Sequence, residues 1–283
     1  RNEVQLLKNA GLVTVLGPKA HGGAGLQWET VLKIVRIIAR ADGSIGQLLG
    51  YHYLWAWAVR LVGTEPQIDA VEELYTANNF FFGGAVNPRD SDLTIVEDAD
   101  QLVYNGRKSF STGGRVADLT VLEGVLQGTE THIFAIVPTD QDGIVFAGDW
   151  DSLGQRLTES GSVEITDVRV DWAGAAGFVD KVYQPLVYNS LNVPALQAVF
   201  NNFYLGIAEG ARTGLANLLT GALFLAAVFF TPVYEVVPVE AAGAALVIVG
   251  ALMLGQITNI DFSKSYIALP AFLTIVAMPF TYS

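Results

Sequence analysis

The chain has 283 residues and a formal net charge of −12, with 28 acidic and 16 basic side chains. This acidic balance disfavours a nucleic-acid partner, because binding to a phosphate backbone needs clustered Lys and Arg. The chain has no cysteine, which excludes disulfides and thiolate chemistry. Its three histidines are scattered and lack the spacing of metal ligands, so no metal site is expected.

Charge is unevenly distributed along the chain. The 51% hydrophobic content is high for a water-soluble enzyme, and the excess lies near the C-terminal end. Beyond residue 212, the ionisable acids and bases are Glu235, Glu240, Asp261 and Lys264. This shift predicts a domain boundary between residues 212 and 213.

Residues 1–77 are predicted to form a helical domain. Apolar residues recur at helical spacing over Thr30–Arg40 and Ile45–Arg60, and a further helix is expected over Gln67–Ala77. The second of these helices is rich in aromatic side chains and contains His52. Its spacing alone favours a core helix in which hydrogen bonds hold the histidine, and a position beside a ligand cavity is the alternative.

From Phe80 onward the apolar pattern changes to strand-like alternation, broken by Gly, Asn, Pro and Asp. Many short strands predict a small barrel or sandwich over residues 78–172. The predicted strands are Phe80–Ala85, Leu93–Glu97, Gln101–Tyr104, Arg107–Ser111, Leu119–Glu123, His132–Pro138, Ser162–Ile165 and Val168–Val170.

The segment Leu102–Gly114, LVYNGRKSFSTGG, is predicted to form a hairpin. Asn105 and Gly106 tolerate the positive φ angles of a two-residue turn. After Phe110, the run Ser111–Gly114 offers hydroxyls and unobstructed backbone N–H groups, which suit a flat ligand with a polar edge. An ordinary hairpin with a glycine-rich exit explains the same pattern, so the segment alone leaves both interpretations open.

A second polar segment begins at Arg156, which is followed by Thr158, Ser160 and Ser162 at alternate positions. Alternation along a strand would place these groups on one face. A guanidinium beside hydroxyls would form a polar wall for an anionic or electron-rich ligand, and a solvated surface strand is the alternative.

A long helix is predicted over Leu191–Arg212, at the end of a segment, residues 173–212, that would begin a second helical domain. Three almost wholly apolar segments follow, Leu215–Phe230, Ala241–Ile257 and Tyr266–Tyr282. Their length and composition predict membrane-spanning helices, with the few charges in the spacers. Each segment is slightly short for a span, so buried helices of a bundle are the alternative.

Six sequence blocks within residues 1–212 carry a family pattern. They are LGPKAHGGAGLQWE (16–29), LLGYHYLWAW (48–57), NNFFFGGAVNP (78–88), NGRKSFSTGG (105–114), DWDSLGQRLTESGSVEITDVRV (149–170) and NNFYLGIAEGAR (201–212). Together they resemble the acyl-CoA dehydrogenase superfamily, and within it the flavin monooxygenases of the dibenzothiophene monooxygenase type. The resemblance implies an α+β fold with N-terminal helices, a middle β-barrel domain and a C-terminal helical bundle, which would be incomplete here.

The resemblance also implies a flavin, either FMN or alternatively FAD. The residues that it assigns to the flavin are Phe110, Ser111, Thr112 and Gly113. One position departs from the pattern, because similar monooxygenases commonly carry a polar residue, often Asn, where this chain has Gly84. A hydrogen bond to the flavin would then be missing.

Further site residues follow from the same resemblance. It implies a catalytic position beside the cavity for His52 and a substrate-binding position for Tyr53 on the same helix. It also implies that Arg156 and Thr158 close the substrate side of the cavity.

The activity implied by the resemblance is that of a two-component monooxygenase. A flavin reductase would supply reduced FMN, which would pass one atom of oxygen to a heteroatom or ring of a small molecule. The alternative is an acyl-CoA dehydrogenase using FAD, which needs a carboxylate base that the sequence does not identify. The expected location of residues 1–212 is cytoplasmic, and a complete bundle would support a homo-oligomer.

The end of the chain carries a second resemblance. The segments RTGLANLLTGALFLAAVFFTP, AALVIVGALML and IALPAFLTIVAMPFTYS are similar to the last part of a hypoxanthine/guanine permease. This similarity implies a chimeric fusion in which residues 213–283 contact or enter a membrane. A non-enzymatic membrane fragment of a purine permease is therefore the third functional hypothesis, and little turnover is expected from the full chain.

Overall fold

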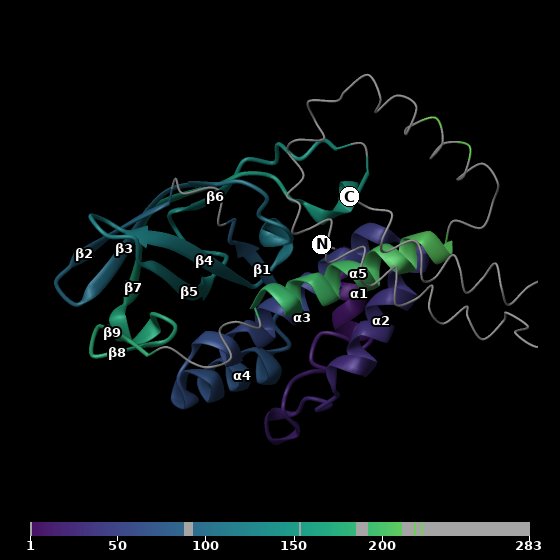
Figure 1. The fold of residues 1–283 in the computed structure, drawn as a ribbon, viewed down its shortest axis with the longest axis horizontal. Helices are drawn as coiled ribbons and strands as arrows, with labels where there is room; N and C mark the ends of the chain where they lie inside the picture. The colour runs from purple at the N-terminus through teal and green to yellow at the C-terminus, as the bar shows by residue number, and fades with distance from the viewer. Residues whose placement is uncertain are drawn as a thin grey trace, which may run out of the picture. The chain divides into compact units, whose positions relative to one another are not determined.

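The computed structural model describes residues 2–87, 93–152, 154–184 and 192–210, and the single residues 218 and 222. The chain divides into two compact units, Arg1–Thr213 and Gly214–Ser283. The helices and strands with defined bounds all belong to the first unit (Figure 1). The three predicted membrane segments lie outside the described residues, apart from Leu218 and Ala222. Among the helices within the described ranges, none combines the length and apolar character that crossing a membrane requires.

The first part of the chain is helical, as the apolar spacing predicted. Two of these helices begin at a side-chain cap: Asp42 accepts hydrogen bonds from the N–H groups of Ser44 and Ile45 at the start of α3. Thr64 and Gln67 form a capping box at the start of α4. The helices are α1 (Asn2–Asn9), α2 (Trp28–Ala41), α3 (Gly43–Val62) and α4 (Glu65–Asn78).

A later helix, α5 (Asn192–Gly210), packs against α2 and α3 (Figure 1). Small residues allow this close approach, because a Cβ atom at Gly206 would lie 2.4 Å from the carbonyl oxygen of Arg36. The shared core includes Val35, Leu49 and Phe203, all fully buried. The helix predicted over residues 191–212 is therefore confirmed over most of its length.

The middle of the first unit is one curled seven-stranded sheet, in the order β1-β4-β2-β3-β7-β6 with β5 paired to β4. The pairs β1–β4 and β2–β4 are parallel, and the others are antiparallel. A small two-stranded sheet, β8–β9, is separate from it in strand pairing, although Phe178 of β8 belongs to the same hydrophobic core. The strands are β1 (Phe82–Ala85), β2 (Thr94–Asp98), β3 (Gln101–Lys108), β4 (Leu119–Leu126), β5 (His132–Pro138), β6 (Ile144–Phe146), β7 (Val163–Asp171), β8 (Phe178–Val179) and β9 (Val182–Tyr183).

The predicted turn at Asn105–Gly106 is wrong. Both residues lie inside β3, which pairs with β7 on either side of them and shifts register between Tyr104 and Gly106. The pair forms a β-bulge, and the Asn105 side chain accepts a hydrogen bond from the N–H of Asp167. The hairpin turn lies one strand earlier, where Asp98 of β2 pairs with Gln101 of β3.

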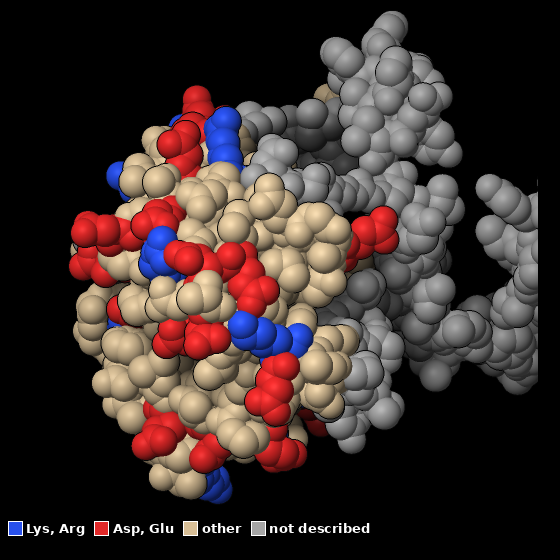
Figure 2. All heavy atoms as spheres, turned by 90° about the vertical axis from the view of Figure 1, so that its left-hand side faces the viewer, with Lys and Arg blue, Asp and Glu red and all other residues tan. Residues whose placement is uncertain are grey.

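A buried ion pair joins strands β3 and β4 of the sheet. Lys108 Nζ lies 2.7 Å from the carboxylate of Glu123, and both side chains are almost fully buried. Outside this pair, charge lies mainly on the surface, and Figure 2 shows acidic side chains spread over one face with single basic groups between them. Several of these groups pair with each other, as Arg169 does with Asp98.

Candidate functional site

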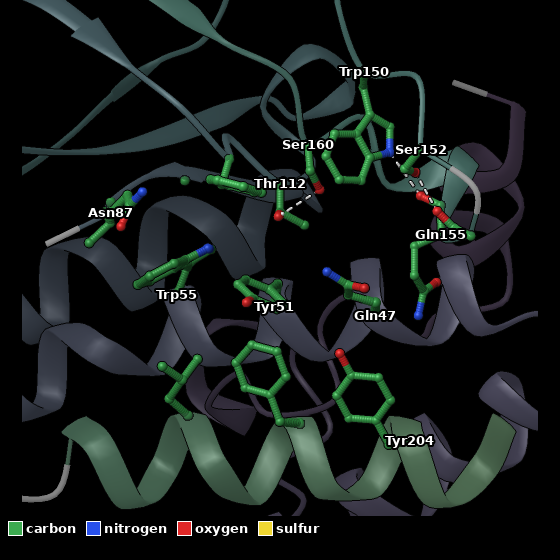
Figure 3. A pocket seen from close by; sticks show the side chains of 16 residues that line it. Gln47, Tyr51, Trp55, Asn87, Thr112, Trp150, Ser152, Gln155, Ser160 and Tyr204 are labelled. Atoms are coloured by element: carbon green, nitrogen blue, oxygen red, sulfur yellow. Dashed lines mark hydrogen bonds between the residues drawn. The ribbon is translucent and has the colours of Figure 1, made fainter. Parts of the chain in front are cut away.

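A cavity of about 660 Å³ lies where α3 and α5 face the end of the curled sheet (Figure 3). Its volume is in the range of small-molecule and cofactor sites. Aromatic rings, hydroxyls and amides make up most of the lining. The lining residues are Gln47, Tyr51, Trp55, Gly84, Val86, Asn87, Phe110, Thr112, Trp150, Ser152, Gly154, Gln155, Ser160, Leu196, Phe200 and Tyr204.

One wall of the cavity is a single face of α3. Gln47, Tyr51 and Trp55 are spaced four residues apart, so they lie on one face of the helix. The ring of Tyr51 makes edge contacts with Trp55 and with Phe200 of α5, with centroids 6.0 Å and 5.6 Å apart. These contacts fix the rings in place and join the two helices across the base of the cavity.

The opposite wall comes from the segment that follows β3. Thr112 Oγ1 lies 2.9 Å from Ser160 Oγ, and Ser160 donates to Thr158 Oγ1 at 2.8 Å. The N–H of Gly113 donates to the carbonyl oxygen of Thr158 at 2.9 Å. A chain of hydroxyls therefore holds the Thr112 segment against residues 158–161, with Thr112 and Ser160 at the cavity surface (Figure 3).

The four residues predicted to hold a flavin have different positions. Phe110 and Thr112 line the cavity, and the ring of Phe110 is 62% exposed beside Trp150. Ser111 is buried and its hydroxyl donates to the carbonyl oxygen of Gly161. Gly113 adopts a left-handed φ of 73°, which lets the chain turn after Thr112. Thus two of these residues face the cavity and two support the segment.

His52 does not line the cavity. The helix places its ring among Tyr53, Tyr75 and Phe81, where Nε2 lies 2.7 Å from the carbonyl oxygen of Val13. Nδ1 accepts a hydrogen bond from the backbone N–H of Phe82. Burial lowers the pKa of His52 to about 4, which keeps the ring neutral. The structure thus favours the core position that helical spacing indicated, and not the cavity position that the resemblance implied.

Tyr53 is fully buried on the same side of α3, and its hydroxyl donates to the carbonyl oxygen of Leu12 at 2.6 Å. Burial raises the pKa of its phenol. Tyr53 therefore has a position in the core and not in the lining of the cavity.

The predicted polar strand at residues 156–162 is also corrected. Arg156–Thr158 is a short 3-10 helix, and β7 begins at Val163. The Arg156 side chain is 68% exposed and pairs with Asp151, away from the cavity lining. Thr158 is buried and supports Ser160 from behind. The hydroxyls of Thr158 and Ser160 come together because the chain turns here, and not because they alternate along a strand.

A third feature of the cavity concerns Gly84 and Trp55. A Cβ atom at Gly84 would lie 2.6 Å from Nε1 of Trp55, so the indole fills the space beside the glycine. The Nε1 atom is buried and has no hydrogen-bond partner among the described residues. Such a donor costs stability unless something pairs with it.

The residues that sequence reasoning missed are mainly those on the cavity face of the helices. Gln47, Tyr51 and Trp55 on α3, and Phe200 and Tyr204 on α5, each follow helical spacing. This spacing could have separated the two faces of α3, but it does not say which face meets the core. Trp150 lies in an irregular loop, and its sequence context carries no such signal.

Charge is absent from the described part of this lining, which includes no Asp, Glu, Lys, Arg or His. Burial raises the pKa of Tyr51 and of Tyr204, so both phenols stay protonated near neutral pH. The arrangement suits a flat, largely apolar ligand that takes hydrogen bonds at its edge.

Comparison with known proteins agrees with this architecture. Residues 1–71 match the family model of the acyl-CoA dehydrogenase N-terminal domain. The chain is 34% identical over 219 residues to a dibenzothiophene monooxygenase of Rhodococcus erythropolis, a match that covers 72% of this chain and 52% of the relative. The chain thus spans about half the length of the curated relatives it matches.

Solved structures give the same similarity. Methanesulfinate monooxygenase MsuC from Pseudomonas fluorescens aligns with a TM-score of 0.69 and 30% identity, over 73% of this chain and 53% of that one. FMN-bound TdsC, a dibenzothiophene monooxygenase from Paenibacillus sp. A11-2, aligns with a TM-score of 0.67 and 32% identity, over 74% of this chain and 55% of that one.

A separate, short similarity exists to the guanine/hypoxanthine permease PbuG of Bacillus subtilis. It is 50% identical over 78 residues and covers 28% of this chain and 18% of the permease. Over about three quarters of its length, by contrast, the chain is similar in sequence and fold to monooxygenases, one of which was solved with FMN bound, and its first 71 residues match the acyl-CoA dehydrogenase N-terminal domain.

Proposed function

We propose that the first unit carries the flavin site of an FMN-dependent, two-component monooxygenase. The observation that carries this proposal is the uncharged aromatic cavity, one wall of which is the Thr112 segment. A planar ring system fits between the ring-lined face of α3 and the hydroxyls of Thr112 and Ser160. Bound FMN supplies the oxygen-activating redox chemistry, which no side chain provides.

The chain's own residues bind and orient the cofactor. Thr112 offers a hydroxyl at the cavity surface, and the hydrogen bonds behind it hold this hydroxyl in one position. The rings of Tyr51, Phe200 and Trp150 present apolar surface that excludes water from the reacting ring. Each role is one of positioning, and none requires a charged side chain in this lining.

The lining also favours a class of substrate. A small anion such as a sulfinate would need a cationic partner, and the described lining offers none. A neutral aromatic heterocycle would pack against the rings of α3 and α5. The lining supports a monooxygenase over the alternative, an acyl-CoA dehydrogenase with FAD, because its described residues supply no carboxylate base.

The proposal includes a flavin reductase as partner and a cytoplasmic location for the first unit. The second candidate, a membrane fragment of a permease, is supported by the similarity of the C-terminal end to PbuG. Fractionation of the expressed full chain into soluble and membrane material separates the two candidates.

The test is a coupled assay on the full chain with a flavin reductase, FMN, NADH and oxygen. Dibenzothiophene and methanesulfinate are the two competing substrates. We expect flavin-dependent incorporation of oxygen into dibenzothiophene, at a low rate, and less into methanesulfinate. Preference for the anion would overturn the substrate class, and a saturating FMN signal without any product would limit the chain to flavin binding.

A further inference from the structure

The indole of Trp55 is a buried donor that the described residues leave unused. Its Nε1 has no hydrogen-bond partner among them, although the residue lines the cavity. Leaving a buried donor unpaired is unfavourable, so such groups in native proteins require an explanation. In Figure 3 the indole lies on the same side of the cavity as Tyr51, across from Thr112 and Ser160.

An unpaired indole does not by itself indicate a ligand. Trp28 also has a buried Nε1 without a partner in the described part of the chain, yet it packs edge-on against Trp57 and does not line the cavity. Trp55 differs because the residue lines the cavity, although its Nε1 is itself buried. The place of Trp55 in the cavity lining, together with its unpaired donor, points to a ligand.

Gly84 is the second observation. A Cβ atom there would approach Trp55 Nε1 to 2.6 Å and Cε2 to 2.7 Å, so any side chain at this position would displace the indole. The N–H of Gly84 donates to the carbonyl oxygen of Thr112 at 3.3 Å. The glycine therefore brings the indole N–H close to the segment on which the ligand is proposed to lie.

We propose that the Trp55 N–H donates a hydrogen bond to an acceptor at the edge of the flavin ring, and that Gly84 makes room for it. The inference rests on the proposed FMN site and adds a positioning residue to it. The acceptor is a ring carbonyl oxygen or an unprotonated ring nitrogen, because an indole can only donate. Gly84 has no side chain that could donate a hydrogen bond, and in this chain the donor comes from Trp55 on α3.

The test is FMN titration of the full chain and of matched variants. Trp55→Phe removes the N–H and retains a flat ring, whereas Trp57→Phe changes the same residue type on α3 at a site that does not line the cavity. We expect Trp55→Phe to weaken FMN binding roughly tenfold, the effect of one lost hydrogen bond, and Trp57→Phe to change it less than about twofold.

A second pair of variants tests the role of Gly84. Trp55→Ala should weaken binding, and adding Gly84→Asn to it should recover part of the affinity, because the amide enters the vacated space with a new donor. Gly84→Asn alone should weaken binding, because its side chain collides with the indole. Tighter FMN binding by the double variant than by Trp55→Ala supports the exchange of donors. If the double variant binds FMN no better than Trp55→Ala does, the exchange of donors is overturned.

Folding failure would not leave the question open. Replacement of Trp55 by benzothienylalanine keeps the shape of the indole and substitutes sulfur for N–H, and a loss of FMN affinity in this protein supports the donor role. If the wild-type chain binds FMN and this replacement binds it equally well, the inference fails and the proposed function stands. If the wild-type chain binds no FMN, both are overturned.

Discussion

The two faces of helix α3 differ in whether their buried polar groups have hydrogen-bond partners. On the core face, His52 and Tyr53 are fully buried, and their polar atoms pair with backbone groups of Val13, Phe82 and Leu12. On the cavity face, the N–H of Trp55 is buried without a partner among the residues that the structure describes. A buried histidine or tyrosine whose polar atoms are all hydrogen-bonded to the backbone therefore indicates a structural role, even where the sequence motif suggests a site residue. An unpaired buried donor on a residue that lines a cavity is the better indication of a ligand site.

The largest expected effect comes from breaking the core face. His52→Leu leaves the carbonyl oxygen of Val13 and the N–H of Phe82 without their partner. The free energy of unfolding should fall by roughly 3–5 kcal/mol, because two buried backbone groups become unpaired. Urea denaturation measures this loss. Gln47→Leu, on the cavity face of the same helix, is the control and should change stability by less than about 1 kcal/mol.

The same histidine gives a pH dependence of stability. Its pKa falls from the ordinary 6.5 to about 4 in the folded protein, so the unfolded chain binds more protons between these values. Its contribution is therefore present above pH 6.5 and is lost as the pH falls toward 4. The loss amounts to about 3 kcal/mol over this range.

Urea denaturation at a series of pH values measures this slope. The same series on His52→Asn provides the control, since Asn does not titrate. An equal slope in both proteins would show that His52 is not the group responsible.

A smaller effect is expected from Tyr53→Phe, which removes the hydrogen bond to the carbonyl oxygen of Leu12. The free energy of unfolding should fall by about 1–2 kcal/mol, because this carbonyl loses its partner. FMN affinity, measured by titration, should stay within about twofold of the wild type. A clear loss of FMN affinity without a matching loss of stability would indicate that Tyr53 contributes to the binding site.

The smallest effect is expected on the cavity wall opposite α3. Thr112→Val removes a hydroxyl at the cavity surface and should weaken FMN binding by about 1 kcal/mol, or roughly fivefold. Thr120→Val is the matched control, because Thr120 bonds to Thr139 and lies outside the lining. Equal FMN affinity in the two variants would show that the Thr112 hydroxyl does not contribute to flavin binding.

The spacing of apolar residues predicted most of the helices and strands. The turn predicted from Asn105 and Gly106 was wrong, because strand pairing with β7 continues on both sides of these residues. Helical spacing located α2, α3, α4 and α5, and alternation located β5 at its observed bounds. The Asn105–Gly106 pair is a strong turn signal, yet β3 and β7 pair on both sides of it and absorb it as a bulge. The partner strand lies far along the chain, so no local pattern contains this information.

The site was predictable only in part for a similar reason. The run from Phe110 to Gly113 identified the segment, because glycine and hydroxyl residues mark a turn that can approach a ligand. Arg156 and Thr158 were assigned to one strand face, but the chain turns there in a 3-10 helix and separates them. Which face of α3 meets the cavity depends on how α5 packs, and a single helix does not carry that information.

The central claim is that a flavin binds between α3, α5 and the Thr112 segment, and a crystal structure of the full chain with FMN tests it most directly. We expect the flavin ring in this cavity, with Thr112 on one side and the Trp55 N–H within hydrogen-bonding distance of its edge. A second, more polar hollow exists in the first unit, lined in part by Lys8, Arg115 and Asp118. A flavin ring bound there, with the first cavity empty, would show that the flavin site does not lie between α3, α5 and the Thr112 segment.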